Sequence, residues 1–121
     1  MTIDTRHGTP VLVCSAEGVS LADGTVALDL IGAALGAGAD LVVLPVERLT
    51  DPFFTLSTGL AGEIAQKFVN YRVRLAVIGD ISRHLAASAA LRDFVRECNR
   101  GRQLWFLANQ DELDERLRKT V

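Results

Sequence analysis

Short apolar runs alternate with longer stretches of helical periodicity along most of the chain. Apolar runs typical of strands covered on both faces lie at 10–15, 41–44, 74–78 and 103–107. Between and after them, apolar residues recur three or four positions apart over 24–35, 58–72, 88–99 and 110–119, which is the spacing of amphipathic helices. We therefore expect an α/β fold with a mostly parallel sheet of four or five strands and alternating helices.

The remaining segments complete this picture. Residues 2–6 are expected to form a short edge strand, followed by a turn at 7–9. The segment 81–87 has no clear period and is expected to be a loop or turn. Because the chain has no linker and no low-complexity stretch, residues 1–121 are expected to form one domain.

Several residues predict where helices begin and end. Gly38 is expected to end the first helix, as glycine does at helix C-termini. Asp51 followed by Pro52 predicts a capped short turn. Asn109 and Glu112 have the spacing of a capping box ahead of the closing helix.

Composition narrows the class of protein. The chain is 49% hydrophobic and 23% charged, with a net charge of −2, which is typical of a globular protein. Cys14 and Cys98 lie in apolar patterns and are expected to be reduced. Together with His7 and His84 they do not have the sequence spacing of a zinc site. We expect no metal and no cofactor. No signal sequence and no apolar run near the ~18 residues of a membrane span is evident, so the protein is expected to be cytoplasmic, away from membranes.

The basic residues do not predict a nucleic-acid partner. Most of them are arginines in the second half of the chain. Arg92, Arg96 and Arg100 share one helix face at four-residue spacing. However, Asp93 and Glu97 are interleaved with them and no aromatic platform is evident.

Sequence motifs for common chemistries are missing. The chain has no Gly-rich phosphate loop, no dinucleotide fingerprint and no Gly-x-Ser-x-Gly elbow. Asp80 and His84 form one candidate pair, in which the carboxylate would orient an imidazole that activates water. The alternative is that Asp80 satisfies N–H groups of its own loop. We assign no catalytic residue.

Charged residues follow two of the buried strands. Glu47 and Arg48 come after the strand at 41–44, and Asp80 comes after the strand at 74–78. Ligands of parallel sheets usually meet the carboxyl ends of the strands, so Glu47, Arg48 and Asp80 form a secondary candidate site. The alternative is that Glu47 and Arg48 pair with each other or with neighbouring helix caps.

The helix predicted over 58–72 carries the densest polar set of the chain. Glu63 and Lys67 have the favourable order of an i,i+4 ion pair, and surface decoration explains each polar residue singly. Surface decoration explains the clustering of these polar residues less well, so we expect an interaction or ligand surface here. Its members are Ser57, Thr58, Gly59, Glu63, Gln66, Lys67, Asn70 and Tyr71.

Several motifs resemble the bacterial domain of unknown function 4180 family. The resemblance covers nearly the whole chain and implies no function, because the family is uncharacterised. The motifs that carry it are Pro45-Val46-Glu47-Arg48-Leu49, Phe53-Phe54, Thr58-Gly59-x-Ala61-Gly62-Glu63, Gln66-Lys67-Phe68-x-Asn70-Tyr71-Arg72, Gly79-Asp80, Leu91-Arg92-Asp93-Phe94 and Glu97-x-Asn99-Arg100-Gly101.

The order of elements also resembles a STAS domain, the fold of anti-sigma-factor antagonists. In that family a buried strand leads to an Asp-Ser-x-Gly-Leu turn and a helix whose start is phosphorylated and touches a partner kinase. The corresponding stretch here is Leu56-Ser57-Thr58-Gly59-Leu60, with Leu56 in place of the acid. A phosphate on Ser57 would suit the N-terminus of a helix. The alternative is that Ser57 or Thr58 only caps that helix.

These features favour a small, non-enzymatic regulatory or protein-interaction domain of STAS-like type. We expect a protein partner, and a homodimer is a reasonable default for a domain of this size. The alternative is a small-molecule-binding domain or small enzyme that uses Glu47, Arg48 and Asp80.

Overall fold

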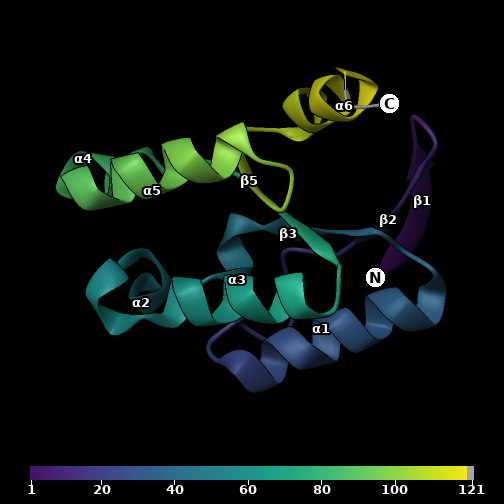
Figure 1. Ribbon diagram of the computed structural model, residues 1–121, viewed down its shortest axis with the longest axis horizontal. Helices are drawn as coiled ribbons and strands as arrows, with labels where there is room; N and C mark the ends of the chain where they lie inside the picture. Colours follow the sequence, from purple (N-terminus) through teal and green to yellow (C-terminus); the bar gives the residue numbers. More distant parts are fainter. Residues whose placement is uncertain (120–121) are drawn as a thin grey trace.

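Five strands stand side by side in the order in which they occur along the chain (Figure 1). The computed structural model describes residues 1–119. The strands are β1 (Thr2–Arg6), β2 (Thr9–Val13), β3 (Leu41–Pro45), β4 (Arg74–Ile78) and β5 (Leu104–Leu107). β1 runs antiparallel to β2, and every later pair is parallel. The expected α/β fold with a mostly parallel sheet is therefore confirmed.

His7 and Gly8 form the turn between β1 and β2. Both residues have positive φ, 50° and 83° respectively. This is the backbone of a two-residue turn whose twist matches that of the strands it joins. Arg6 pairs with Thr9 across the turn. The expected edge strand is confirmed, and the turn is one residue shorter than expected.

Three long helices connect the parallel strands. They are α1 (Gly24–Ala37), α3 (Leu60–Asn70) and α5 (Ala89–Arg100), and they lie along the same face of the sheet (Figure 1). α6 (Gln110–Lys119) follows β5 and packs on the other face. Shorter helices fill the connections: η1 (Val46–Arg48), α2 (Asp51–Phe54) and η2 (Leu56–Thr58) after β3, and α4 (Ser82–Ala87) after β4. None of the helices described over 1–119 has the length and apolar character needed to cross a membrane.

The segment 81–87 is not the loop that we expected, because Ser82–Ala87 forms α4. The Ser82 N–H donates to Asp80 Oδ1 at 2.9 Å, and Arg92 of α5 donates to Leu85 O at 2.6 Å. No residue of α4 is buried. Only Leu85 packs partly against the core, and a six-residue helix with one such contact shows no apolar period, which is why the sequence pattern missed it.

Helix ends follow the predicted signals with one exception. Gly38 ends α1 in the left-handed conformation with φ of 72°, and the Glu112 N–H donates to Asn109 Oδ1 at 2.9 Å. Asp51, by contrast, does not cap α2. It is the first residue of that helix, and the capping position is held by Thr50 without a side-chain hydrogen bond. Pro52 then occupies a first-turn position that needs no N–H partner.

Each face of the sheet has its own core. One face packs against α1, α3 and α5 with the side chains of Leu12, Cys14, Val42, Leu44, Leu75, Val77, Leu104 and Phe106. The other face packs against Leu113 and Leu117 of α6 with Val11, Leu41, Val43, Ala76, Trp105 and Leu107. Burial on both faces explains why the strands read as continuous apolar runs.

One side chain closes the open edge of β5. Asn99, in the last turn of α5, donates from Nδ2 to Phe106 O at 3.1 Å and accepts the Phe106 N–H at Oδ1 at 2.8 Å. Its amide therefore takes the place of the neighbouring strand that this edge lacks. Arg116 of α6 donates to Asn99 O at 2.5 Å. Because unpaired strand edges invite pairing with other chains, Asn99 also limits edge-to-edge association.

We predict that Asn99→Ala lowers the free energy of unfolding by about 1–3 kcal/mol, because two partly buried backbone groups lose their partners. It should also increase self-association at high concentration. Urea unfolding and sedimentation velocity test both effects. Asn70→Ala, which removes an exposed amide from α3, is the matched control and should change little. Equal stability of the two variants would contradict the role given to Asn99.

Candidate functional site

The residues predicted to form one polar surface over 58–72 do not gather in one place. Ser57 and Thr58 lie in η2, and Gly59 stands at the N-cap of α3 with φ of 76°. Tyr71 follows the other end of α3 and is exposed. The set therefore runs along the whole helix, and its two ends face different neighbours.

Two adjacent hydroxyls in η2 have different roles. Thr58 Oγ1 lies 2.7 Å from Pro52 O and 2.8 Å from Thr55 O, and it accepts the Leu60 N–H at 3.2 Å. These bonds tie η2 to α2 and to the first turn of α3. The expected N-cap by Ser57 or Thr58 is not formed, because Gly59 holds that position and no side chain caps α3. Ser57 is exposed, and its hydroxyl has no hydrogen bond within residues 1–119.

Glu63 and Lys67 rest on the start of α1. A methyl group at Gly24 would lie 2.4 Å from Lys67 Cε and 2.8 Å from Glu63 Oε1, so both side chains lie directly over this glycine. The expected Glu63–Lys67 salt bridge is not among those formed in the described part of the chain. Gln66 donates to Asn70 Oδ1 at 2.9 Å on the exposed side. Glu63 and Lys67 thus contribute to the contact between α1 and α3.

The secondary set of Glu47, Arg48 and Asp80 is not brought together either. Asp80 bonds to Ser82 at the start of α4, and these hydrogen bonds hold the pKa of the Asp80 carboxyl below its usual value. Glu47 is exposed in η1. Asp80 does not orient His84, whose ring stacks elsewhere. The alternative interpretation of Asp80, that it satisfies N–H groups of its own loop, is the one confirmed.

Arg48 is buried and holds the loop between β2 and α1. Only 7% of the residue is exposed. Its Nε donates to Val19 O at 2.8 Å and its Nη1 donates to Ser15 O at 3.1 Å. Gly18 lies against the guanidinium, since a methyl group there would be 2.9 Å from Arg48 Cζ. The expected pairing of Arg48 with Glu47 is not seen, because the guanidinium turns toward backbone carbonyls of this loop.

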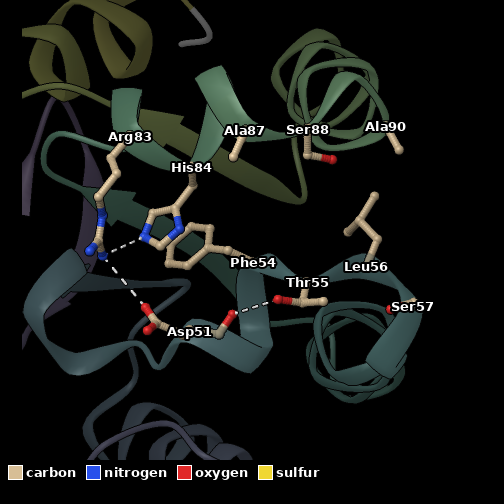
Figure 2. Close-up of a pocket in the computed structure, with 10 residues that line it drawn as sticks. All are labelled: Asp51, Phe54, Thr55, Leu56, Ser57, Arg83, His84, Ala87, Ser88 and Ala90. Carbon is tan, nitrogen blue, oxygen red and sulfur yellow. Dashed lines mark hydrogen bonds and ion pairs between the residues drawn. The ribbon is translucent and has the colours of Figure 1, made fainter.

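The largest concavity described lies between α2–η2 and α4–α5. It is a groove of about 560 Å³, open to solvent, at the carboxyl ends of β3 and β4 (Figure 2). This is the edge at which ligands of parallel sheets usually bind. The lining residues are Asp51, Phe54, Thr55, Leu56, Ser57, Arg83, His84, Ala87, Ser88 and Ala90. Of the predicted surface, only Ser57 is among them.

One end of the groove carries three ionisable side chains. Arg83 Nη2 lies 3.5 Å from Asp51 Oδ1 and 3.3 Å from His84 Nε2. The Arg83 guanidinium thus lies between the Asp51 carboxylate and the His84 ring. The His84 ring is stacked on Phe54 with the centroids 4.0 Å apart (Figure 2). Arg83 is 80% exposed and Asp51 is 82% exposed, so their pairing is weak and open to competition.

The other end of the groove is lined by small and hydroxyl side chains. Ser88 caps α5 by accepting the Leu91 N–H at 3.1 Å, and Thr55 Oγ1 donates to Asp51 O at 3.2 Å. Ser57 lies on the opposite wall from Ser88 (Figure 2). Of these three hydroxyls, Ser57 alone is not engaged by the described residues, and it is the one that a bound molecule would find free.

Sequence reasoning missed Asp51, Phe54 and Arg83 as site residues, and it placed His84 with the wrong partner. A signal was present. Asp51 and Arg83 each follow the end of a neighbouring strand, β3 or β4, by a few residues. The sequence rule considered only the residues directly after the strand ends, such as Glu47 and Asp80. In the structure, short helices follow the strand ends, and Asp51, Phe54 and Arg83 lie on α2 and α4.

The thiols and carboxylates do not form a second reactive centre. Cys14 and Cys98 are free thiols. Burial raises the pKa of the Cys14 thiol, and the nearby Arg48 charge only partly offsets this. Burial and Glu97 raise the pKa of the Cys98 thiol. Across residues 1–119, no group of three His, Cys, Asp or Glu side chains is placed to hold a metal ion.

Comparison with known proteins identifies the family alone. The family described as domain of unknown function (DUF4180) matches residues 6–117 of the chain. No curated protein and no solved structure gives a significant match.

We predict that Asp80→Ala changes stability in a pH-dependent manner. Because hydrogen bonds from Ser82 lower the Asp80 pKa, this carboxylate stabilises the native state above the usual carboxyl pKa. The contribution is lost as the pH falls through the lowered value. The midpoint temperature of thermal unfolding should therefore be higher for wild type than for Asp80→Ala at neutral pH. The two midpoints should converge in acid. Asp111→Ala, on exposed α6, is the control; a difference for Asp80→Ala that persists unchanged in acid would contradict the assignment.

Proposed function

We propose that this chain, which belongs to the family of the domain of unknown function DUF4180, is a small cytoplasmic regulatory domain that acts by binding another protein. The binding site in this proposal is the groove between α2–η2 and α4–α5. One observation carries it: Ser57 lies in the same groove as Arg83 and His84, which come from a different part of the chain.

The order of elements supports a STAS-like domain. An antiparallel hairpin is followed by three β–helix–β units and a closing helix. In STAS domains the turn before a helix, after a buried strand, meets a partner kinase. The corresponding residue here, Ser57, is exposed and lies shortly before α3. This chain differs in that η1 and α2 separate the buried strand β3 from that turn.

The composition of the groove suits a partner segment with an acidic group. Arg83 is largely exposed and its contacts with Asp51 and His84 are long, so a carboxylate or phosphate of the partner would compete for it. Arginine and aromatic residues are common at the energetically important positions of interfaces. The small side chains of Ala87, Ser88 and Ala90 leave room for the partner's own side chains at the other end.

Binding accounts for this site better than catalysis does. A general base needs a lone pair that points to its substrate and a group that orients the ring. In the groove, His84 Nε2 lies 3.3 Å from Arg83 Nη2, and the ring is stacked on Phe54. No carboxylate among the lining residues bonds to the imidazole. The groove thus has recognition groups without an oriented acid–base pair.

The alternative suggested by the sequence was a small-molecule site formed by Glu47, Arg48 and Asp80. Arg48 and Asp80 line different hollows, the first beside α1 and the second between α4, α5 and α6. A single ligand therefore does not explain the set. A homodimer is the other partner class in this proposal, and the oligomeric state in solution separates it from binding of a different protein.

We predict that Arg83→Glu combined with Ala87→Trp weakens partner binding at least tenfold, or about 1.4 kcal/mol. The first change reverses the charge at one end of the groove, and the second fills it. Partners are captured with wild-type bait, identified by mass spectrometry and titrated again as purified proteins against each variant.

Two control variants make this test specific. Arg96→Glu changes a similar exposed arginine on α5 outside the groove and should leave affinity unchanged. Lys67→Glu with Asn70→Ala alters the surface that the sequence predicted on α3. If Lys67→Glu with Asn70→Ala loses binding while the groove variant binds fully, the groove is not the binding site. The site would then lie on α3.

A further inference from the structure

A second cavity lies beside the loop that joins β2 to α1. Its volume is about 320 Å³, at the small end of the roughly 300–1,000 Å³ found for ligand pockets. Three kinds of side chain meet there: one buried cation, two acids and an apolar set. The lining residues are Met1, Ser15, Glu17, Gly18, Val19, Val26, Asp29, Leu30 and Arg48.

The buried cation is Arg48, which has no carboxylate partner. Its hydrogen bonds use Nε and Nη1, and both go to backbone carbonyls. No salt bridge of the described chain includes it. Nη2 has no acceptor within residues 1–119 and is not fully buried, and Arg48 lines the cavity. A buried charge is normally paired, so this cation is prepared for an anionic group from outside.

The acids at the same cavity exclude a simple anion. Glu17 and Asp29 are exposed lining residues, and neither forms a salt bridge within 1–119. Their charges would repel a ligand that is only negative, and Arg48 would repel one that is only positive. A molecule that carries both charges satisfies all three residues.

The rest of the cavity is apolar. Val26 and Leu30 come from α1, and Val19 and Met1 project from the neighbouring loop and chain start. Val19 is 67% exposed and Met1 is 70% exposed. An apolar group bound between them would cover surface that the chain by itself leaves in water.

We propose that this cavity binds a small apolar zwitterion, an amino acid with a branched aliphatic side chain. Its carboxylate accepts from Arg48 Nη2, its ammonium faces Asp29 and Glu17, and its side chain lies against Val19, Val26 and Leu30. This site is separate from the groove and does not rest on the function proposed for it.

Calorimetric titration of the full chain with L-leucine tests the proposal. Two analogues each lack one charge: 4-methylpentanoate has no ammonium and 3-methylbutylamine has no carboxylate. We expect leucine to bind and each analogue to bind at least tenfold more weakly. No binding of leucine, isoleucine or valine at about 10 mM, a weak-binding limit, would overturn the proposal. So would an analogue that binds as tightly as leucine.

Asp29→Asn tests the same idea from the protein side. Asp29 is exposed, so the variant should fold as wild type does. We expect it to bind leucine at least fivefold more weakly and to lose most of the preference for leucine over 4-methylpentanoate. Asp111→Asn on α6 is the matched control and should keep both. Arg48→Lys should abolish binding, but it also removes bonds to Val19 and Ser15, so the Asp29 variant decides. Unchanged discrimination in Asp29→Asn would refute the ammonium contact.

Discussion

The structure depends on one topological constraint: its parallel strands stand in chain order, and right-handed connections place every connecting helix on the same face. Two consequences follow. The opposite face is left to α6, which must cross from β5 back over the sheet, where Arg6 of β1 meets Asp114 and Gln110. The last strand has no neighbour, so its edge is closed by the Asn99 amide. All connections leave the carboxyl edge, and both proposed sites lie there.

The sequence predicted the parts of the fold that depend on burial. The run at 41–44 is buried on both faces in the structure. The hairpin of β1 and β2 has the left-handed His7 and Gly8 that such a turn requires. Burial leaves a pattern because every residue that meets the core must be apolar. The same reasoning fails for α4, which buries none of its residues and is stabilised by contacts from Asp80 and Arg92.

The candidate site was less predictable, because a helix pattern tells which side is polar and not what covers that side. Glu63 and Lys67 looked like a free surface, but they lie over Gly24 at the start of α1, where the missing side chain makes room for them. Arg48 looked like part of a site with Glu47 and Asp80, but its guanidinium turns to Ser15 and Val19 and lines a different cavity from Asp80. In each case the deciding neighbour is distant in sequence.

The groove differs from these cases in what its polar groups do. Asn99 and Thr58 satisfy backbone groups, so their polarity serves the fold. Arg83 and Ser57 have no such task. The wall of the groove that α2 forms is anchored in the core, because Phe53 is 1% exposed and packs edge-on to Phe54 at 5.2 Å. This wall is therefore formed before anything binds, which keeps the ordering cost of binding small there.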